Sequence, residues 1–235
     1  MIQHLRRCLL LGFFLALTLL SSACTPPLSP QTIVTQAPPP ETFPQAYYRE
    51  AQAAGSSIYQ VDPNRSIVTI IVRRDGALAR LGHDHVVASH HLNGFVDVTG
   101  ERADLHILLE QLVVDETALR LSAGFTSQPS EDAIAGTRQN MLNKVLDAKQ
   151  FPHVLISVKR KSGESQVLST SITLHGIEKN FEIPVQFTTL ADGLEVNGQL
   201  AFNQSDFGIT PFSILGGAIR VNDRLDLAFK IVARK

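Results

Sequence analysis

Apolar side chains recur at every second position through most of the chain from Ile58 onward. The pattern is clearest over residues 181–187, 194–202 and 225–231. Successive side chains of an extended strand point to opposite faces, so each of these segments presents one continuous apolar face. Turn sequences such as Asp192-Gly193 separate the segments. The alternation therefore predicts antiparallel strands whose apolar faces must cover one another.

The number and length of these segments narrow the architecture. Many antiparallel strands in one domain of under about 200 residues form either a sandwich or a closed barrel. About eight strands close into a barrel whose interior is filled by side chains or holds one small ligand. Several segments are about 8 to 10 residues long, which at ~3.3 Å per residue predicts a tube roughly 30 Å deep, suited to a linear molecule. We predict a mainly β fold, a single antiparallel β-barrel.

One segment departs from the period of two. Residues 130–148 carry apolar side chains at helical spacing, and Ser130 stands before two acidic residues as an N-cap. The helix must end before Phe151-Pro152, because proline disfavours helical backbone in the residue that precedes it. We predict one α-helix inserted between strands, and a shorter helix over residues 47–54.

The first residues are a targeting segment rather than part of the fold. Basic residues precede the apolar run Cys8–Leu20, which is shorter than the about 20 residues that a membrane-spanning helix needs. Residues 1–23 are therefore predicted to be a cleaved signal peptide. Residues 24–57 are rich in proline and poor in large apolar residues, a composition typical of a stiff tether. Residues 58–235 remain as the barrel domain.

The sequence Ser21-Ser22-Ala23-Cys24 resembles the lipobox of bacterial lipoproteins. The resemblance implies acylation of Cys24 and attachment to a membrane. Ser21 takes the place of the usual leucine, and ordinary secretion after Ala23 is the alternative. Thr25 is not the aspartate that favours retention at the inner membrane. We expect an exported protein, at the periplasmic face of the outer membrane in a Gram-negative source and otherwise at the cell surface or secreted.

Charge and cysteine content argue against two classes of protein. The chain has 22 acidic and 21 basic residues, and Arg6 and Arg7 leave with the signal peptide. Nothing in this balance favours nucleic acid as a partner. Cys8 leaves as well, so Cys24 is the single cysteine of the mature sequence and an internal disulfide is not expected. Stability must therefore come from burial of the core.

The segment Gly82-His83-Asp84-His85 concentrates polar chemistry. His83 and His85 project to one face of a strand, which suggests a metal site, although zinc normally takes at least three protein ligands. A turn that closes one end of the barrel, or contact with the polar head group of a ligand, would equally account for the segment. Asp84 could orient an imidazole for general-base catalysis. Because no activated nucleophile accompanies it, we expect no enzyme activity and no catalytic residue.

Six stretches within residues 58–235 carry a further signal. They are Tyr59–Asp62, Asn93–Phe95, Arg138–Met141 with Leu146–Pro152, Ile172–Lys179, Asn203–Gly208 and Arg220–Asp223. Taken in order, they resemble the YceI-like family of periplasmic and secreted lipid-binding proteins, over essentially the whole domain. Arg65-Ser66 stands where family members commonly have His-Ser, and residues 78–85 also depart from the family pattern. These differences bear on which ligand is bound.

The resemblance implies a lipocalin-like antiparallel barrel whose long interior takes up a polyisoprenoid or similar lipid, without a catalytic centre or cofactor. The same apolar residues would also fill a solid core, so a ligand-free envelope interaction or stress-response module is an alternative. The interior candidates are Phe95, Leu105, Ile107, Leu109, Ile156, Val158, Phe181, Ile183, Phe187, Val196, Leu200, Phe202, Leu227 and Phe229. The candidates for the mouth or a head group are His83, Asp84, His85 and Arg138. The sequence indicates no oligomeric state.

Overall fold

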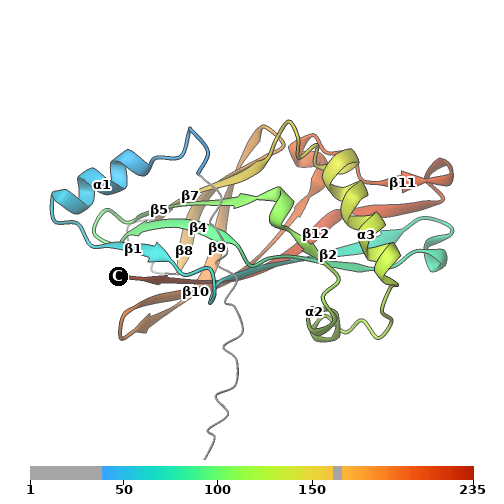
Figure 1. Cartoon of the computed structure of the whole chain (residues 1–235), viewed down its shortest axis with the longest axis horizontal. Helices are drawn as coiled ribbons and strands as arrows, with labels where there is room; N and C mark the ends of the chain where they lie inside the picture. The colour runs from blue at the N-terminus through green and yellow to red at the C-terminus, as the bar shows by residue number, and fades with distance from the viewer. Residues whose placement is uncertain (1–38, 161–165) are drawn as a thin grey trace, which may run out of the picture. The chain divides into compact units, whose positions relative to one another are not determined.

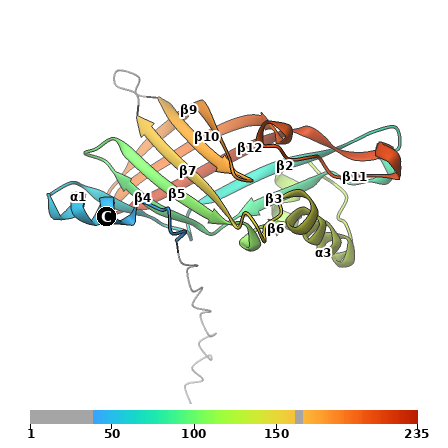
Figure 2. The ribbon, with the colours of Figure 1, turned by 90° about the horizontal axis from the view of Figure 1, so that it is seen from above.

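The computed structural model of the protein describes residues 39–160 and 166–235. These residues belong to one compact unit, and their strands form one sheet that wraps around an interior (Figure 1, Figure 2). The predicted signal peptide, Cys24 and the first part of the predicted tether lie outside the described residues. Among the residues that are described, no helix has the length and apolar character needed to cross a membrane.

The sheet closes into an eight-stranded antiparallel barrel, which confirms the predicted fold class. Five of the eight positions are single strands, namely β7 (His153–Arg160), β8 (Val167–Leu174), β9 (Ile177–Leu190), β10 (Gly193–Asn203) and β12 (Ile219–Arg234). The other three are broken into halves, β1 (Ile58–Val61) with β2 (Ile67–Asp75), β3 (His85–Ser89) with β4 (Leu92–Asp97), and β5 (Arg102–Leu108) with β6 (Val113–Val114). β12 closes the barrel, because it pairs with β10 on one edge and with β1 and β2 on the other. β11 (Ser213–Ile214) folds back on the start of β12.

A buried serine keeps this closure intact where β1 gives way to β2. The Ser66 hydroxyl accepts a hydrogen bond from the Val232 N–H at 3.0 Å and donates one to the Val232 carbonyl at 3.3 Å. Buried backbone groups need partners; the Val232 carbonyl also accepts from the Asp62 N–H at 2.8 Å, and the serine hydroxyl supplies the partner of the Val232 N–H. The break between β1 and β2 therefore leaves no gap in the hydrogen bonding of the barrel at Val232.

The register of the strands directs the alternating apolar residues inward. Leu105, Ile156 and Ile172 lie directly across from one another on β5, β7 and β8, and residues paired in this way share one face of a sheet. Their polar neighbours Asp104 and Ser157 pair with each other on the outer face. The period of two in the sequence is therefore the period of the barrel wall.

The predicted inserted helix is present between β6 and β7. α3 spans Glu131–Asn140, and the Ser130 side chain caps it by accepting a hydrogen bond from the Ala133 N–H at 3.3 Å. The helix continues as a π-helical turn over Met141–Val145. It stops shortly before Asp147, which has a φ of 42°, because right-handed helical backbone cannot pass through that left-handed conformation. The helix therefore ends slightly earlier than predicted.

A second short helix was not predicted. α2 spans Thr117–Ser122, and so few residues give too little of a helical period to be recognised in a sequence. Single 3₁₀ turns form at η1 (Ala79–Leu81), η2 (Leu109–Gln111), η4 (Gln204–Phe207) and η5 (Leu215–Gly217).

The chain just before β1 packs against the outer wall of the barrel, although the sequence analysis assigned it to the tether. The predicted short helix is confirmed as α1 (Gln45–Ala53). Tyr48 on this helix is only 2% exposed, its ring centroid lies 5.2 Å from that of Phe95, and its hydroxyl donates a hydrogen bond to Asp104 at 2.6 Å. The packed part of the chain therefore starts before residue 58.

The same outer face buries a histidine. His106 is 4% exposed, and its ring centroid lies 4.9 Å from that of Phe43 and 6.1 Å from that of His153. Burial, with a smaller contribution from the charge of His153, lowers the pKa of His106 to about 4. The folded state therefore holds the neutral form of this imidazole.

Tyr48→Ala is expected to lower the free energy of unfolding by about 3 kcal/mol, because truncation of a buried aromatic side chain leaves a cavity and removes a hydrogen bond from Asp104. Urea denaturation of residues 39–235 measures the change. Glu50→Ala, on the exposed side of the same helix, is the matched control and is expected to change the free energy by less than about 0.5 kcal/mol. Equally small effects of both substitutions would contradict the packing of α1 on the barrel.

The stability of the barrel is expected to fall as the pH is lowered from 6.5 towards 4. In this window the unfolded chain protonates His106, whose ordinary pKa is 6.5, while the folded state, with a pKa of about 4, does not. The unfolded state then binds more protons, so its population rises as the pH falls. The shift corresponds to a loss of about 3 kcal/mol at full protonation.

His106→Gln is the variant that tests this pH dependence, and its free energy of unfolding is expected to vary less between pH 7 and pH 4. His90→Gln removes a histidine whose side chain is 41% exposed and serves as the control. A wild-type profile that stays flat over the window, or one unaffected by His106→Gln, would show that this buried ring does not set the acid sensitivity.

Candidate ligand-binding cavity

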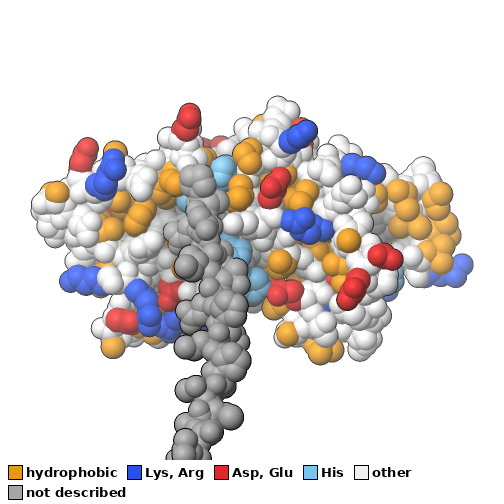
Figure 3. Space-filling model, in the orientation of Figure 1, with side chains coloured by type: hydrophobic (Ala, Val, Ile, Leu, Met, Phe, Trp, Pro, Cys, Tyr) orange, Lys and Arg blue, Asp and Glu red, His pale blue; other side chains and the backbone are white. Residues whose placement is uncertain are grey.

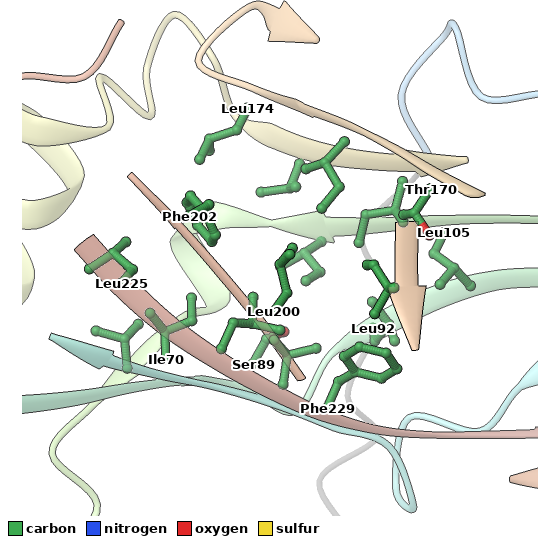
Figure 4. Close-up of a pocket in the computed structure, with 18 of the residues that line it drawn as sticks. Ile70, Ser89, Leu92, Leu105, Thr170, Leu174, Leu200, Phe202, Leu225 and Phe229 are labelled. Carbon is green, nitrogen blue, oxygen red and sulfur yellow. The ribbon is translucent and has the colours of Figure 1, made fainter. Parts of the chain in front are cut away.

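The barrel encloses a cavity of about 780 Å³. Its wall is mainly aliphatic and aromatic, and the residues that line it come from strands all around the barrel and from the α3 segment. Figure 4 shows Leu105, Leu200 and Phe229, from three different strands, pointing into this common space. The volume lies within the range of roughly 300–1,000 Å³ that is usual for small-molecule sites.

The exposure of the wall residues shows that the barrel is hollow. Ile70, Ile156, Leu200 and Leu227 point inward and line the cavity, yet each is only partly buried. In a filled core, apolar side chains of this size are packed on all sides. The structure therefore contradicts the filled barrel that a ligand-free module required.

Most of the predicted interior residues line the cavity. Those that do are Leu105, Ile107, Leu109, Ile156, Val158, Ile183, Phe187, Val196, Leu200, Phe202, Leu227 and Phe229. Phe187 differs from the others because it is 42% exposed and lies 5.6 Å from the Arg160 guanidinium. It therefore belongs to an end of the cavity rather than to its middle.

Two predicted interior residues are not among the described residues that line the cavity. Phe95 points to the outer face, where it packs against Phe43 and Tyr48, so the prediction for Phe95 was wrong. Phe181 belongs to a cluster of aromatic rings, with centroids 6.4 Å from Phe202 and 6.3 Å from Phe207. It supports the wall from behind these rings instead of forming its surface.

The contribution of β2 to the cavity was not predicted from the sequence. Val68, Ile70 and Val72 line the cavity at alternate positions. The intervening residues of the run from Ile67 to Val72 include Ile71, so both faces of this strand are largely apolar. The alternation of apolar and polar residues is therefore not visible in the sequence of β2, although alternate residues of this strand face the interior.

One end of the cavity carries polar side chains. Arg74, His83, His85 and Arg220 line it, and we call it the histidine end. β12 begins here at Ile219 and reaches the opposite end of the barrel at Arg234. Arg102, Arg160 and Phe187 line the cavity at that opposite end. The cavity is thus an apolar tube with polar groups at both ends.

A buried ionic network fixes His85. Its Nδ1 lies 2.6 Å from Asp115 Oδ2, and Arg120 Nη1 donates to Asp115 Oδ1 at 2.6 Å. Burial by itself would raise the pKa of Asp115, but hydrogen bonds from His85, the Val86 N–H and Arg120 outweigh burial and lower it. The carboxylate therefore stays charged and holds the imidazole ring in one orientation.

Asp84 does not have the role that the sequence suggested. Its carboxylate accepts a hydrogen bond from the Arg74 N–H at 2.9 Å and lies 3.8 Å from Arg74 Nε, so it is Asp115 that orients a histidine. The His83 and His85 ring centroids are 6.3 Å apart. In the part of the chain that the structure describes, no group of three or more His, Cys, Asp or Glu side chains is placed to share a metal ion.

Arg138 also lies away from the cavity mouth. Its Nε donates to the Leu112 carbonyl at 3.0 Å, and its Nη2 donates to the Glu110 carbonyl. The side chain therefore fastens α3 to the break between β5 and β6. The prediction of a head-group contact for Arg138 was wrong, because the backbone carbonyls of this break need donors.

Comparison with known proteins agrees with this architecture. The YceI-like domain family matches residues 59–233. Among solved structures, a polyisoprenoid binding domain from Saccharophagus degradans implicated in plant cell wall breakdown has a TM-score of 0.54 at 12% identity and covers 75% of this chain and 97% of its own. BcnA of Burkholderia cenocepacia has a TM-score of 0.52 at 15% identity and covers 73% of this chain and 98% of its own.

At these identities the two structures establish the fold alone. No curated protein matches the sequence. The match to the family extends over most of the chain and confirms the resemblance found in the sequence. The chain therefore belongs to the family of YceI-like domain proteins.

Proposed function

We propose that this protein binds one elongated apolar lipid, of the polyisoprenoid type, inside its barrel and acts as a binding protein rather than an enzyme. The observation that carries the proposal is the hollow interior of about 780 Å³ with its apolar wall. The description of the Saccharophagus degradans protein as a polyisoprenoid binding domain supports the choice of lipid class.

The physical basis of binding is burial along the wall. Each methylene group that leaves water contributes about 0.8 kcal/mol, so a chain of several isoprene units is held without any specific polar contact. Wall residues that are only partly buried, such as Ile156 and Leu227, gain packing partners when a chain fills the space. Affinity then depends on how much of the chain the tube covers.

The polar ends are proposed to set the direction of the ligand. A polar head group at the histidine end would meet Arg74, Arg220 and the two histidines that line the cavity there. Because Asp115 already engages His85 Nδ1, Nε2 is the ring nitrogen that remains for a ligand. The apolar tail would then run toward Phe187 at the opposite end.

Leu200→Trp is expected to reduce the lipid that co-purifies with residues 39–235 by about tenfold, since the indole would displace roughly two methylene groups of ligand from the wall. Native mass spectrometry and analysis of organic extracts measure lipid per barrel. Gln199→Trp adds the same side chain at the neighbouring exposed position and is expected to leave lipid content unchanged. Equal lipid content in both variants, or no lipid in the wild-type barrel, would contradict binding inside the barrel.

The cellular location is part of the proposal. On the basis of the lipobox-like Ser21–Cys24 sequence, we place the protein in the cell envelope as a lipoprotein acylated on Cys24. In a Gram-negative source this means the periplasmic face of the outer membrane. A lipid carrier held there would stay close to the membranes that contain its ligand. Transport, storage and sensing are all compatible with this location.

Cys24→Ser is expected to move the full-length protein from the membrane fraction to the soluble fraction, because a protein without acyl chains has no durable anchor in the membrane. Cell fractionation and the mass of the N-terminal peptide measure the change. Cys8→Ser, which alters the cysteine within the predicted signal peptide, is the control and is expected to leave the protein in the membrane fraction. A wild-type protein that is already soluble and begins at Cys24 without acyl chains would instead indicate ordinary secretion.

A further inference from the structure

Two loops meet at the histidine end and form a projecting tip. The tip consists of residues 76–82, which follow β2 and include η1, and residues 213–218, which contain β11 and η5. The Leu78 N–H donates a hydrogen bond to the Ala218 carbonyl at 2.8 Å, so the two loops are joined by their backbones. They therefore form one continuous surface beyond the end of the barrel.

The tip exposes large apolar side chains. Leu81 is 58% exposed, Ile214 45% and Leu215 68%. Figure 3 shows hydrophobic side chains gathered at the end of the molecule where Figure 1 places β11. A cluster of exposed apolar side chains on a folded domain usually marks a surface that contacts something.

Leu215 is exposed in an unfavourable backbone conformation. Leu215 has a φ of 52°, and Gly216 and Gly217 follow with φ values of 64° and 89°. The left-handed region is unfavourable for a residue with a side chain and costs little for glycine. A leucine at this position is therefore costly in backbone conformation as well as in solvation, as expected for a side chain that is used in contact with another surface.

The tip borders the cavity. Gly82 belongs to the tip and lines the cavity, as do the adjacent residues His83, Ile219 and Arg220. A molecule that enters or leaves at the histidine end thus passes beside the exposed leucines. Contact made by the tip and access to the cavity are located at the same place.

Charge identifies the kind of surface. Arg73, Arg74 and Arg80 lie on or beside the first loop and Arg220 beside the second, against the carboxylates Asp75 and Asp84. Both carboxylates already contact arginine, Asp75 with Arg220 at 2.8 Å and Asp84 with Arg74 at 3.8 Å. The tip is therefore basic, although the whole chain has slightly more acidic than basic residues.

We propose that the tip inserts into the surface of an anionic phospholipid bilayer and connects the cavity with the membrane. Exposed apolar side chains surrounded by arginines suit the boundary between headgroups and acyl chains. Residues 76–82 and 213–218 are fewer than the roughly 20–30 residues per side of a standard protein interface, which favours a lipid surface over a protein. The role in ligand exchange rests on the function proposed above, whereas membrane contact does not.

Vesicle sedimentation tests the contact with residues 39–235, whose closed sheet and core need no earlier residue and which lack Cys24. Binding is expected to vesicles of phosphatidylcholine with phosphatidylglycerol, and weaker binding to phosphatidylcholine alone. Leu81→Ser, Ile214→Ser and Leu215→Ser together are expected to lower the partition constant at least tenfold, because the inserted apolar area is lost. Arg80→Gln is expected to lower it about fivefold on the anionic vesicles only.

Leu121→Ser is the matched control for Leu215→Ser, since Leu121 on α2 is 64% exposed and lies outside both loops. Its partition constant is expected to equal that of the wild type. Absence of wild-type binding, or equal losses in the Leu121 and Leu215 variants, would overturn the proposal. So would a dimer, seen by analytical ultracentrifugation, that the triple variant abolishes while vesicles bind neither protein.

Co-purified lipid, measured on the same samples, separates this proposal from the one about the cavity. The triple variant leaves the wall of the cavity unchanged, so its lipid content is expected to match that of the wild type. Lipid in the barrel without vesicle binding would contradict membrane contact by the tip and leave the cavity proposal unaffected. Vesicle binding without lipid in the barrel would overturn the cavity proposal and leave the tip standing.

Discussion

Closure of the sheet is the constraint on which the rest of this structure depends. β12 pairs with β10 over Arg224–Arg234 on one edge and with β2 and then β1 on the other, so the ring of strands closes. A ring of backbone hydrogen bonds holds its shape without filling from the inside, which is how partly buried side chains persist along the wall. Ser66 maintains this ring of hydrogen bonds, because its hydroxyl bonds to the Val232 backbone where β1 gives way to β2.

The sequence predicts the wall of the barrel well because alternation is a direct record of which face is covered. The prediction from alternation fails where both faces of a strand are apolar or buried. β2 is apolar on both sides, and Phe95 is buried on the outer face beneath α1, so the period alone assigns neither correctly. Proline in residues 38–44 indicated a tether, although Phe43 and Tyr48 from this region are buried against the barrel. Local composition does not report such long-range contacts.

The polar part of the site could be predicted only in part. The two histidines are visible as a spacing of two, and both line the cavity. Asp115 and Arg120, which fix one of them, are 30 and more residues away in sequence and reach it because β3 pairs with β6. Asp84, which is next to His85 in sequence, instead accepts a hydrogen bond from the Arg74 N–H. Adjacency in sequence was misleading because Asp84 precedes β3 and bonds back to Arg74, whereas the pairing of β3 with β6 brings Asp115 to His85.

For the proposed lipid carrier, the division between wall and ends combines affinity with selectivity. An apolar wall attracts any chain in proportion to the area it buries, so it discriminates poorly among lipids. Discrimination among ligands needs polar groups that are costly to leave unpaired. The His85 imidazole is such a group, and Asp115 and Arg120 fix its orientation before a ligand arrives. Because Asp115 is held charged by three donors, it keeps a proton on His85 Nδ1 when the ring is neutral. Nε2 is then an acceptor, and under the proposed function it favours a ligand whose head group donates a hydrogen bond at that end of the cavity.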